Sequence, residues 1–168
     1  MFDKNNEKEA FNPHLVAFFC NWCTYTAADL AGTARMTYEP NVRVIRIMCS
    51  GRLDPQFVLW AFREGADGVL IGGCHPGDCH YQEGNYKARR RFLLLQKYLQ
   101  FMGIEKERVR MEWIAASEGD KVQSVINEMT ETIRRLGPLH LEPVSMRQER
   151  SLETAEPDNI AVMKEGTL

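Results

Sequence analysis

Short apolar segments alternate with longer amphipathic segments over most of this chain, and this alternation is the feature that most restricts its fold. Four segments read as strands, over 15–20, 42–49, 68–73 and 109–115. The first and third are continuously apolar, as expected of strands that are buried on both faces. Strands that alternate with helices form right-handed crossovers and a parallel sheet. The chain is therefore predicted to fold as a small α/β domain.

Local signals mark the helices between these strands. Four helices are expected, over 27–35, 55–65, 82–102 and 117–136. Thr24 or Thr26 is placed to cap the first, and Asp54 followed by Pro55 is a typical start for the second. With short connections between all the elements, we expect a doubly wound, flavodoxin-like sheet of about four strands in the order 2-1-3-4.

The periodic pattern stops near Pro138, and this position is the expected domain boundary. The chain has 168 residues, enough for one ordinary domain with a short appendage. We divide it into an α/β domain over 1–137 and an extended C-terminal tail over 138–168. The tail has isolated apolar residues without a period, so it is expected either to be disordered or to dock on a partner protein.

Charge and hydrophobicity exclude several classes of function. The 21 Lys and Arg residues against 23 Asp and Glu residues leave a net charge of -2, which argues against a nucleic-acid-binding protein. No apolar run approaches the roughly 20 residues that span a bilayer, so no membrane association is expected. The first nine residues lack the basic and apolar regions of a secretory signal. We therefore expect a cytoplasmic location.

The distribution of cysteine is the main functional signal. The five cysteines are Cys20, Cys23, Cys49, Cys74 and Cys79. An odd number without a secretory signal favours a reducing compartment over a disulfide scaffold. In a doubly wound sheet, ligands bind at the carboxyl ends of the strands, where the strand order reverses. Strands one and three meet there, so Cys20 and Cys23 should face Cys74 and Cys79, and these four thiols are the preferred metal ligands.

Three kinds of site use such a set of thiols. A 2Fe–2S cluster spreads its ligands more widely than a single tetrahedral ion does, which suits two separate loops with a four-residue gap in one of them. A structural zinc site needs the same four thiolates. The pair Cys20 and Cys23, which follows a strand and precedes a helix, is also compatible with a dithiol oxidoreductase. No cysteine run typical of a 4Fe–4S cluster is present.

Other residues near these cysteines have an ordinary interpretation beside a functional one. Cys49 is expected one strand further out, as a fifth candidate ligand or as a buried core thiol. His75 and His80 would replace two thiolates in a Rieske-like site, but loop polarity or hydrogen bonding near the sulfurs explains them as well. The basic run 87–91 is most often a solvated helix face, and otherwise a contact for an anionic partner or for the cluster.

Three segments together resemble one known family. They are FCNWCTY over 19–25, RIMCSGR over 46–52 and GGCHPGDCHY over 72–81, and the likeness continues to about residue 136. Together they closely resemble the delta subunit of methyl-viologen-reducing hydrogenase, the partner of heterodisulfide reductase in methanogens. All three segments occur in order and without gaps, so we regard the resemblance as specific. The tail lies outside it.

The resemblance implies an electron-relay subunit that does no substrate chemistry of its own. Such subunits carry one 2Fe–2S cluster in a hetero-oligomeric complex. They pass electrons from a nickel–iron hydrogenase, or sometimes a formate dehydrogenase, to the flavin-containing subunit of heterodisulfide reductase, where the flavin bifurcates electron pairs. The family offers five cysteines for four ligand positions, and the resemblance alone leaves the fifth undecided. A zinc-stabilised scaffold subunit without a redox role and a dithiol oxidoreductase remain the alternatives.

Overall fold

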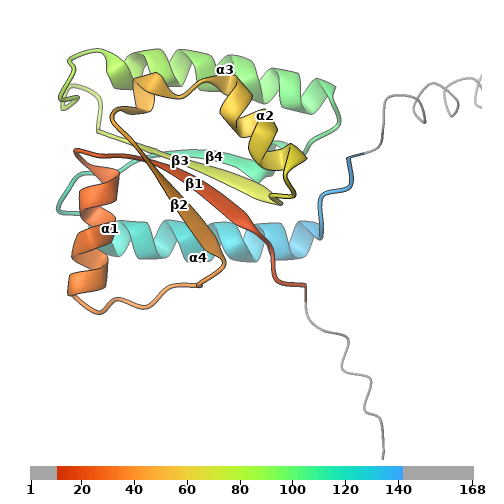
Figure 1. The fold of residues 1–168 in the computed structure, drawn as a ribbon, viewed down its shortest axis with the longest axis horizontal. Helices are drawn as coiled ribbons and strands as arrows, with labels where there is room; N and C mark the ends of the chain where they lie inside the picture. The colour runs from red at the N-terminus through yellow and green to blue at the C-terminus, as the bar shows by residue number, and fades with distance from the viewer. Residues whose placement is uncertain (1–10, 142–168) are drawn as a thin grey trace, which may run out of the picture.

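Four strands and four helices make up the α/β domain (Figure 1). The computed structural model of the protein describes residues 11–141. The elements are β1 (Leu15–Cys20), α1 (Thr24–Thr33), β2 (Val42–Ile47), α2 (Pro55–Arg63), β3 (Gly68–Gly73), α3 (Gly84–Phe101), β4 (Val109–Trp113) and α4 (Gly119–Leu136). Two 3-10 turns, η1 (Ser50–Arg52) and η2 (Lys106–Arg108), precede α2 and β4. The predicted alternation of strands and helices is confirmed.

The strands form one parallel sheet in the order β2-β1-β3-β4, as predicted. Helices α1 and α4 cover one face, and α2 and α3 cover the other (Figure 1). Cys20 is paired with Ile47 across β1 and β2, and Phe19 with Gly72 across β1 and β3. Because these strands end at the same level, the loops that follow them leave the sheet together at one edge.

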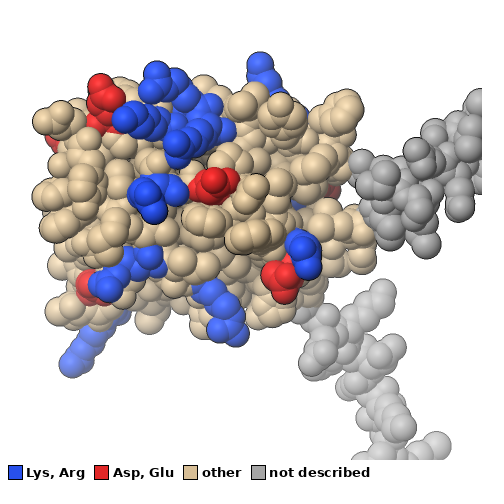
Figure 2. All heavy atoms as spheres, turned by 45° about the horizontal axis from the view of Figure 1, so that its top comes forward, with Lys and Arg blue, Asp and Glu red and all other residues tan. Residues whose placement is uncertain are grey.

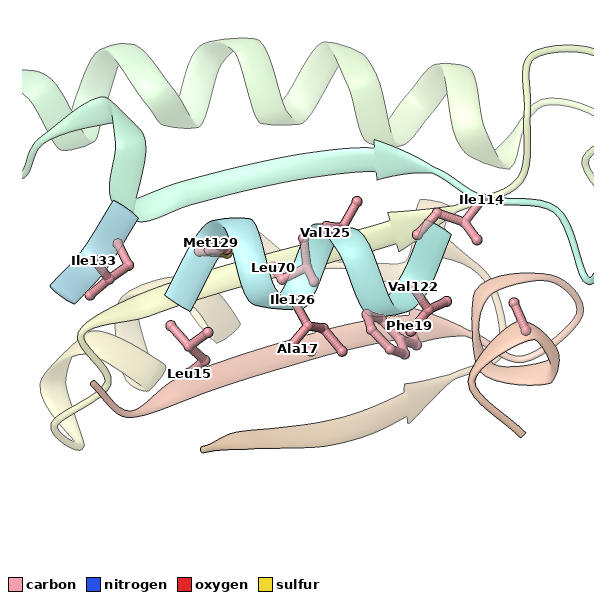
Figure 3. Packing of buried hydrophobic residues seen from close by; sticks show 11 residues of the cluster. Leu15, Ala17, Phe19, Leu70, Ile114, Val122, Val125, Ile126, Met129 and Ile133 are labelled. Atoms are coloured by element: carbon pink, nitrogen blue, oxygen red, sulfur yellow. The ribbon is translucent and has the colours of Figure 1, made fainter. Parts of the chain in front are cut away.

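The α1 and α4 face owes most of its burial to α4. Five apolar side chains of α4, all at helical spacing, are buried: Val122, Val125, Ile126, Met129 and Ile133. They lie against Leu15, Ala17 and Phe19 of β1 and Leu70 of β3 (Figure 3). Each such side chain contributes roughly 1.5–3 kcal/mol when it is buried. The helix therefore anchors β1 and β3 side by side.

The opposite face is closed by two helices of different length. Val58 and Phe62 of α2 and Leu95 and Leu99 of α3 pack on the sheet residues Phe18, Val69 and Ile71. Asp54 begins α2 as expected, because its side chain accepts a hydrogen bond from the N–H of Gln56 over 2.9 Å. Strand β2 lies at the open edge of the sheet, and Ile45 in its middle is 46% exposed.

Two boundaries differ from the prediction in ways that affect the cysteines. The second strand was expected to reach Cys49, but β2 ends at Ile47 and Cys49 begins η1, with its sulfur accepting the N–H of Gly51. The first helix begins at Thr24 directly after Cys23, without a side-chain cap. The hydroxyl of Thr26 donates instead to the carbonyl of Asn21. The first difference places Cys49 at the start of a turn that contacts α3.

The last residues of the described range contact the α/β domain. The N–H of Leu139 donates to a carboxylate oxygen of Asp67 over 3.0 Å. Leu139 also packs against the hydrophobic cluster that α2 and α3 form with the sheet. The predicted tail over 138–168 therefore begins in contact with the α/β domain, and its residues from 142 onward lie outside the described part. Within residues 11–141, no helix combines the length and the apolar character that crossing a membrane requires.

Candidate metal centre

All five cysteines lie at the carboxyl edge of the sheet and are buried. Three of them form one group: the sulfur atoms of Cys20, Cys23 and Cys74 lie within 4.8 Å of one another. Within this group, the sulfurs of Cys20 and Cys74 are 3.8 Å apart. The group combines the ends of β1 and β3, which the strand order was expected to bring together.

The other two cysteines form a second group. The sulfurs of Cys49 and Cys79 lie 3.8 Å apart, although Cys49 was expected to stand one strand further out. The chain leaves β2 at Ile47, and η1 returns Cys49 toward the start of α3. Cys79 therefore has Cys49 as a neighbour, and it does not join the group of three thiols. The choice of four ligands among the five stays a prediction.

A glycine lets α1 approach the end of β3 closely. Thr24, the first residue of α1, is fully buried against Gly72, and a Cβ atom at Gly72 would overlap the Thr24 side chain. Cys23 immediately precedes Thr24. The missing side chain at Gly72 therefore allows the turn with Cys23 to sit directly beside Cys74.

A second glycine lets α3 approach the second pair of thiols. A Cβ atom built on Gly84 would overlap the sulfur of Cys49 and would lie 3.0 Å from the sulfur of Cys79. The backbone of Gly84 therefore lies so close to the two thiols that any larger residue at this position would displace them. The first turn of α3 forms one wall of the centre.

Asn85 ties the same helix end to the Cys74 loop. Its side-chain nitrogen donates to the carbonyls of Cys74 and His75 over 3.2 and 2.7 Å. Its side-chain oxygen accepts the N–H of Tyr86 over 2.9 Å. Asn85 is 1% exposed, so these bonds have no competition from water. The amide group therefore holds the loop that carries Cys74 against α3.

Within the group of three thiols, Cys20 is the one that carries negative charge most readily. Hydrogen bonds from the thiols of Cys23 and Cys74 hold the pKa of Cys20 well below its ordinary value. The same contacts raise the pKa of Cys23 and of Cys74, because each of them keeps its proton beside a thiolate. A metal bound here would take the place of those protons.

In the second group, the thiolate is favoured at Cys79. Burial alone would raise the pKa of Cys79, but the N–H groups of Tyr81, Asn85 and Gly84 and the thiol of Cys49 donate to its sulfur and lower the pKa below the ordinary value. Burial raises the pKa of Cys49. Each group thus contains one cysteine whose lowered pKa favours the thiolate, and the thiolate is the form that binds metals.

A buried hydroxyl beside the thiols has no partner. Ser50 follows Cys49, is 1% exposed, and its oxygen is the one buried side-chain oxygen or nitrogen of residues 11–141 without a hydrogen bond. A Cβ atom at Gly73 would lie 2.9 Å from this oxygen, so the hydroxyl lies against the residue that precedes Cys74. Buried hydroxyl groups normally find an acceptor. An inorganic sulfide or a metal-bound thiolate at this edge would supply one, so the residues present fit a metal cluster.

Neither histidine of the loop points its ring at the thiols. The His75 ring nitrogen Nε2 lies 2.8 Å from a carboxylate oxygen of Glu118, which also accepts the N–H of Ala115. The His80 ring stacks on Trp22 with 3.9 Å between the ring centroids. In residues 11–141 the grouped metal-ligating side chains are cysteines alone. The interpretation of these histidines as loop contacts is therefore favoured over the Rieske-like one.

The outer side of the centre is open to a shallow hollow. Its volume is about 300 Å³, and its walls include Cys23, Cys74 and the stacked rings of Trp22 and His80. The indole N–H of Trp22 also donates to the Tyr81 hydroxyl over 3.4 Å. The other three cysteines do not line this hollow and are at most 8% exposed. The centre is thus shielded on most sides and lies close to the surface on one.

Sequence reasoning did not find Gly84 or Asn85. No pattern in the sequence marks them, because their roles depend on contacts with residues far along the chain. The position of Gly84 and Asn85 just after Cys79, at the start of a helix, was the one available signal. Glycine and asparagine are poor helix formers, and their presence in a first turn suggests a role other than helix stability.

The fold and the thiols define a small α/β protein with a buried group of cysteines, suited to binding a metal, at the carboxyl edge of a parallel sheet. Residues 15–137 match the family model described as methyl-viologen-reducing hydrogenase, delta subunit. The chain belongs to this family. The matched residues span the whole α/β domain from β1 to the end of α4 and contain all five cysteines.

Individual relatives agree with the family assignment. The chain is 58% identical over 133 residues to the vhc iron-sulfur subunit of the F420-non-reducing hydrogenase of Methanococcus voltae, covering 79% of this chain and 92% of that protein. It is also 58% identical over 134 residues to the iron-sulfur subunit of the F420-non-reducing hydrogenase of Archaeoglobus profundus, covering 80% and 98%.

A third relative places the same domain inside a longer chain. One subunit of the ferredoxin/F(420)H(2)-dependent CoB-CoM heterodisulfide reductase of Methanosarcina acetivorans is 46% identical over 127 residues. The match covers 76% of this chain and 16% of that protein. The domain thus occurs both as a separate polypeptide and as a part of a larger one.

Proposed function

We propose that this protein is an electron-transfer subunit that carries one 2Fe–2S cluster. In this proposal it receives electrons from a nickel–iron hydrogenase, or from a formate dehydrogenase, and passes them to the flavin-containing subunit of heterodisulfide reductase in an electron-bifurcating methanogenic complex. The observation that carries the proposal is the arrangement of the five thiols in two adjacent groups. The family and the names of the relatives support the iron–sulfur assignment.

The spacing of the sulfurs suits two metal ions better than one. A metal with two thiolates at about 2.3 Å in tetrahedral geometry holds their sulfurs about 3.8 Å apart. Cys20 with Cys74 and Cys49 with Cys79 both have a separation of 3.8 Å. A single zinc ion would need four sulfurs that all lie at this distance from one another. In the described part of the chain, three thiols lie within 4.8 Å of one another, and no fourth thiol joins them.

This geometry favours a ligand set other than the one preferred from the sequence. The sequence set is Cys20, Cys23, Cys74 and Cys79, with Cys49 left free. The two groups suggest instead that Cys49 and Cys79 bind one iron and that two of the other three thiols bind the second. We propose the latter arrangement, because Cys79 lies nearest to Cys49. When bound, the cluster would supply a one-electron redox centre, and the chain's own residues would hold it, exclude water and set its surroundings.

The protein surface supports a hetero-oligomer. Three large apolar side chains lie along one side of α3 at helical spacing: Leu94, Tyr98 and Phe101, which are 56%, 59% and 89% exposed. Exposed apolar stripes of this kind mark contact sites with other proteins. The Methanosarcina relative is named as part of a heterodisulfide reductase, and the Methanococcus relative as part of a hydrogenase. We infer from these names that the two electron partners of this chain are of those two kinds.

Metal analysis of anaerobically purified protein tests the cluster. The proposal requires about two iron and two sulfide per chain and a brown protein. Stoichiometric zinc without sulfide would replace it with the zinc-stabilised scaffold. A colourless, metal-free protein that catalyses thiol–disulfide exchange would replace it with the dithiol oxidoreductase.

Serine replacement of each cysteine distinguishes the two ligand sets. We expect Cys49→Ser and Cys79→Ser each to lose most of the bound iron, because each removes one of two thiolates from the same iron. One of Cys20, Cys23 and Cys74 should tolerate serine. The measurement is iron and sulfide per chain, together with the visible absorption and the EPR spectrum of the reduced protein. A near-normal Cys49→Ser variant would restore the set predicted from the sequence.

Removal of the C-terminal segment tests its predicted role at a partner. We expect a chain that ends at Leu141 to keep its cluster spectrum, because the centre and both cores lie within residues 11–141. Its affinity for the partner subunits should fall about tenfold, the effect of losing one or two anchoring side chains. Anaerobic co-purification and titration with the purified partner subunits measure this. Unchanged affinity would show that residues 142–168 are dispensable for assembly.

A further inference from the structure

The four basic residues in the first half of α3 have different surroundings. Lys and Arg side chains gather on the side of the molecule that carries α3 (Figure 2). Lys87 forms an exposed ion pair with Glu83, with 3.4 Å between Nζ and the carboxylate oxygen. Within residues 11–141, the guanidinium groups of Arg89 and Arg90 form neither a hydrogen bond nor an ion pair. The interpretation of this run as a solvated face therefore fits three of the four side chains.

Arg91 is the exception, because its guanidinium contacts the backbone of η1. Its Nη1 donates to the carbonyl of Gly51 over 2.6 Å and to the carbonyl of Leu53 over 3.3 Å. Hydrogen bonds from a charged donor are shorter and stronger than those between neutral groups. Arg91 thus links both η1 and the residue Leu53, which precedes α2, to helix α3.

The turn that Arg91 holds is the turn that positions Cys49. The N–H of Gly51 donates to the Cys49 sulfur over 3.4 Å. The N–H of Arg52 donates to the Cys49 carbonyl over 2.9 Å. Gly51 also lies directly against the backbone of Gly84, where an added Cβ atom would be 2.7 Å from the Gly84 carbonyl oxygen. Arg91, the Cys49 sulfur and Gly84 thus all contact Gly51, so a displacement of Gly51 would move the N–H that reaches the sulfur.

We propose that Arg91 is a positioning residue for Cys49: its guanidinium fixes η1 in the conformation in which the N–H of Gly51 donates to the Cys49 sulfur. The first consequence concerns the protein alone, since the Cys49 thiol stays covered only while η1 is held in place. The second rests on the proposed function. Hydrogen bonds to the sulfurs of a cluster favour its more negative, reduced form, so Arg91 would raise the reduction potential.

Alkylation of the metal-free, reduced protein tests the positioning without a cluster. The rate at which iodoacetamide labels each cysteine is followed by peptide mass spectrometry in Arg91→Ala, Arg91→Lys and the control Arg90→Ala. We expect Cys49 in Arg91→Ala to react about tenfold faster than in the unchanged protein, since a lost charged hydrogen bond shifts a local opening by about that factor. Arg90→Ala should react like the unchanged protein. Arg91→Lys keeps the charge and a donor and should recover most of the protection.

Equal rates in Arg91→Ala and Arg90→Ala would overturn the proposal, and so would a uniform acceleration of all five cysteines. Far-UV circular dichroism checks that each variant is folded. If Arg91→Ala does not fold, Arg91→Gln takes its place, with the expectation that it labels faster than Arg91→Lys. These results do not depend on which metal the protein binds, so they separate this proposal from the proposed function.

Potentiometric titration of the iron-loaded chain tests the second consequence. We expect Arg91→Ala to lower the equilibrium constant for one-electron reduction about tenfold, a shift of about 59 mV to more negative potential. Arg90→Ala removes the same charge from the same helix and should shift the potential much less. Equal shifts in the two variants would show that charge alone acts, which would overturn the positioning role.

Discussion

Replacing Gly84 by alanine should remove nearly all of the iron that the proposed cluster would bring to this protein. The new Cβ atom would overlap the Cys49 sulfur and lie 3.0 Å from the Cys79 sulfur. Neither sulfur can move freely, because Cys49 is held by η1 and Cys79 accepts hydrogen bonds from the first turn of α3. One of the two thiols must therefore leave its place. We expect iron per chain to drop at least about tenfold, because changes beside metal ligands typically cost about 10- to 100-fold in metal affinity. Iron and sulfide analysis measures this drop.

A matched variant separates this steric effect from the general effect of alanine in a helix. Gly32 lies within α1, and a Cβ atom there would meet nothing within 4 Å. Gly32→Ala should keep the full iron content and raise the free energy of unfolding by about 0.5–1 kcal/mol, since alanine is the better helix former. Full iron content in Gly84→Ala would mean that the two thiols have room to rearrange.

Replacing Arg108 by alanine should cause the largest loss of stability. Arg108 is 1% exposed and donates to the Asp67 carbonyl over 3.1 Å and to a Glu105 carboxylate oxygen over 2.7 Å. Its removal leaves a buried carbonyl without its donor and creates a cavity. We expect the free energy of unfolding to fall by about 3–4 kcal/mol. Urea unfolding at neutral pH measures this, with the exposed neighbour Lys106 changed to alanine as the control.

The Lys106→Ala control should change the free energy of unfolding by less than about 0.5 kcal/mol, as is usual at exposed positions. Arg108 lies before β4, at the edge of the sheet opposite to the cysteines. The iron content should therefore be unchanged where the variant is folded. A loss of iron from folded Arg108→Ala would contradict the separation of the stability determinants from the metal centre.

The pH dependence of the stability loss in Arg108→Ala follows from Glu105. The hydrogen bond from Arg108 lowers the pKa of Glu105 in the folded protein below its ordinary value. A carboxyl group with a lowered folded pKa stabilises the protein above its unfolded pKa, and this contribution is lost as the pH falls through the folded pKa. The difference in stability between Arg108→Ala and the unchanged protein should therefore shrink on acidification. An unchanged difference would show that Glu105 contributes nothing to it.

The sheet could be predicted because its determinants are local. The segments that form β1 and β3 are continuously apolar, and burial of both their faces follows from that composition alone. The short connections and the constant handedness of crossovers then leave few possible strand orders. Asp54 with Pro55 at the start of α2 shows the same principle, because a helix cap depends on residues only two or three positions apart.

The grouping of the thiols could not be read from the sequence. Cys49 comes at the end of the segment expected as strand two, and its assignment to an outer position followed from that. Its actual place depends on the exit from β2 at Ile47 and on the contact between η1 and Gly84. That contact joins residues more than thirty positions apart, and no local pattern encodes it. Cys20, Cys23 and Cys74 lie together as expected, because strand order alone brings the ends of β1 and β3 together, whereas Cys79 lies beside Cys49.

The position of β2 at the edge of the sheet has a consequence for solubility. Its sequence VRVIRI has four β-branched residues, and one side of its backbone has no neighbouring strand. Edge strands of this kind can nucleate edge-to-edge aggregation. Arg43 and Arg46 are both exposed, and because they are three positions apart their side chains leave opposite faces of the sheet. If two copies of the protein paired edge to edge along β2, the positively charged arginines of the two strands would lie near one another and repel. The arginines thus act as gatekeepers that oppose fibre formation by the free protein.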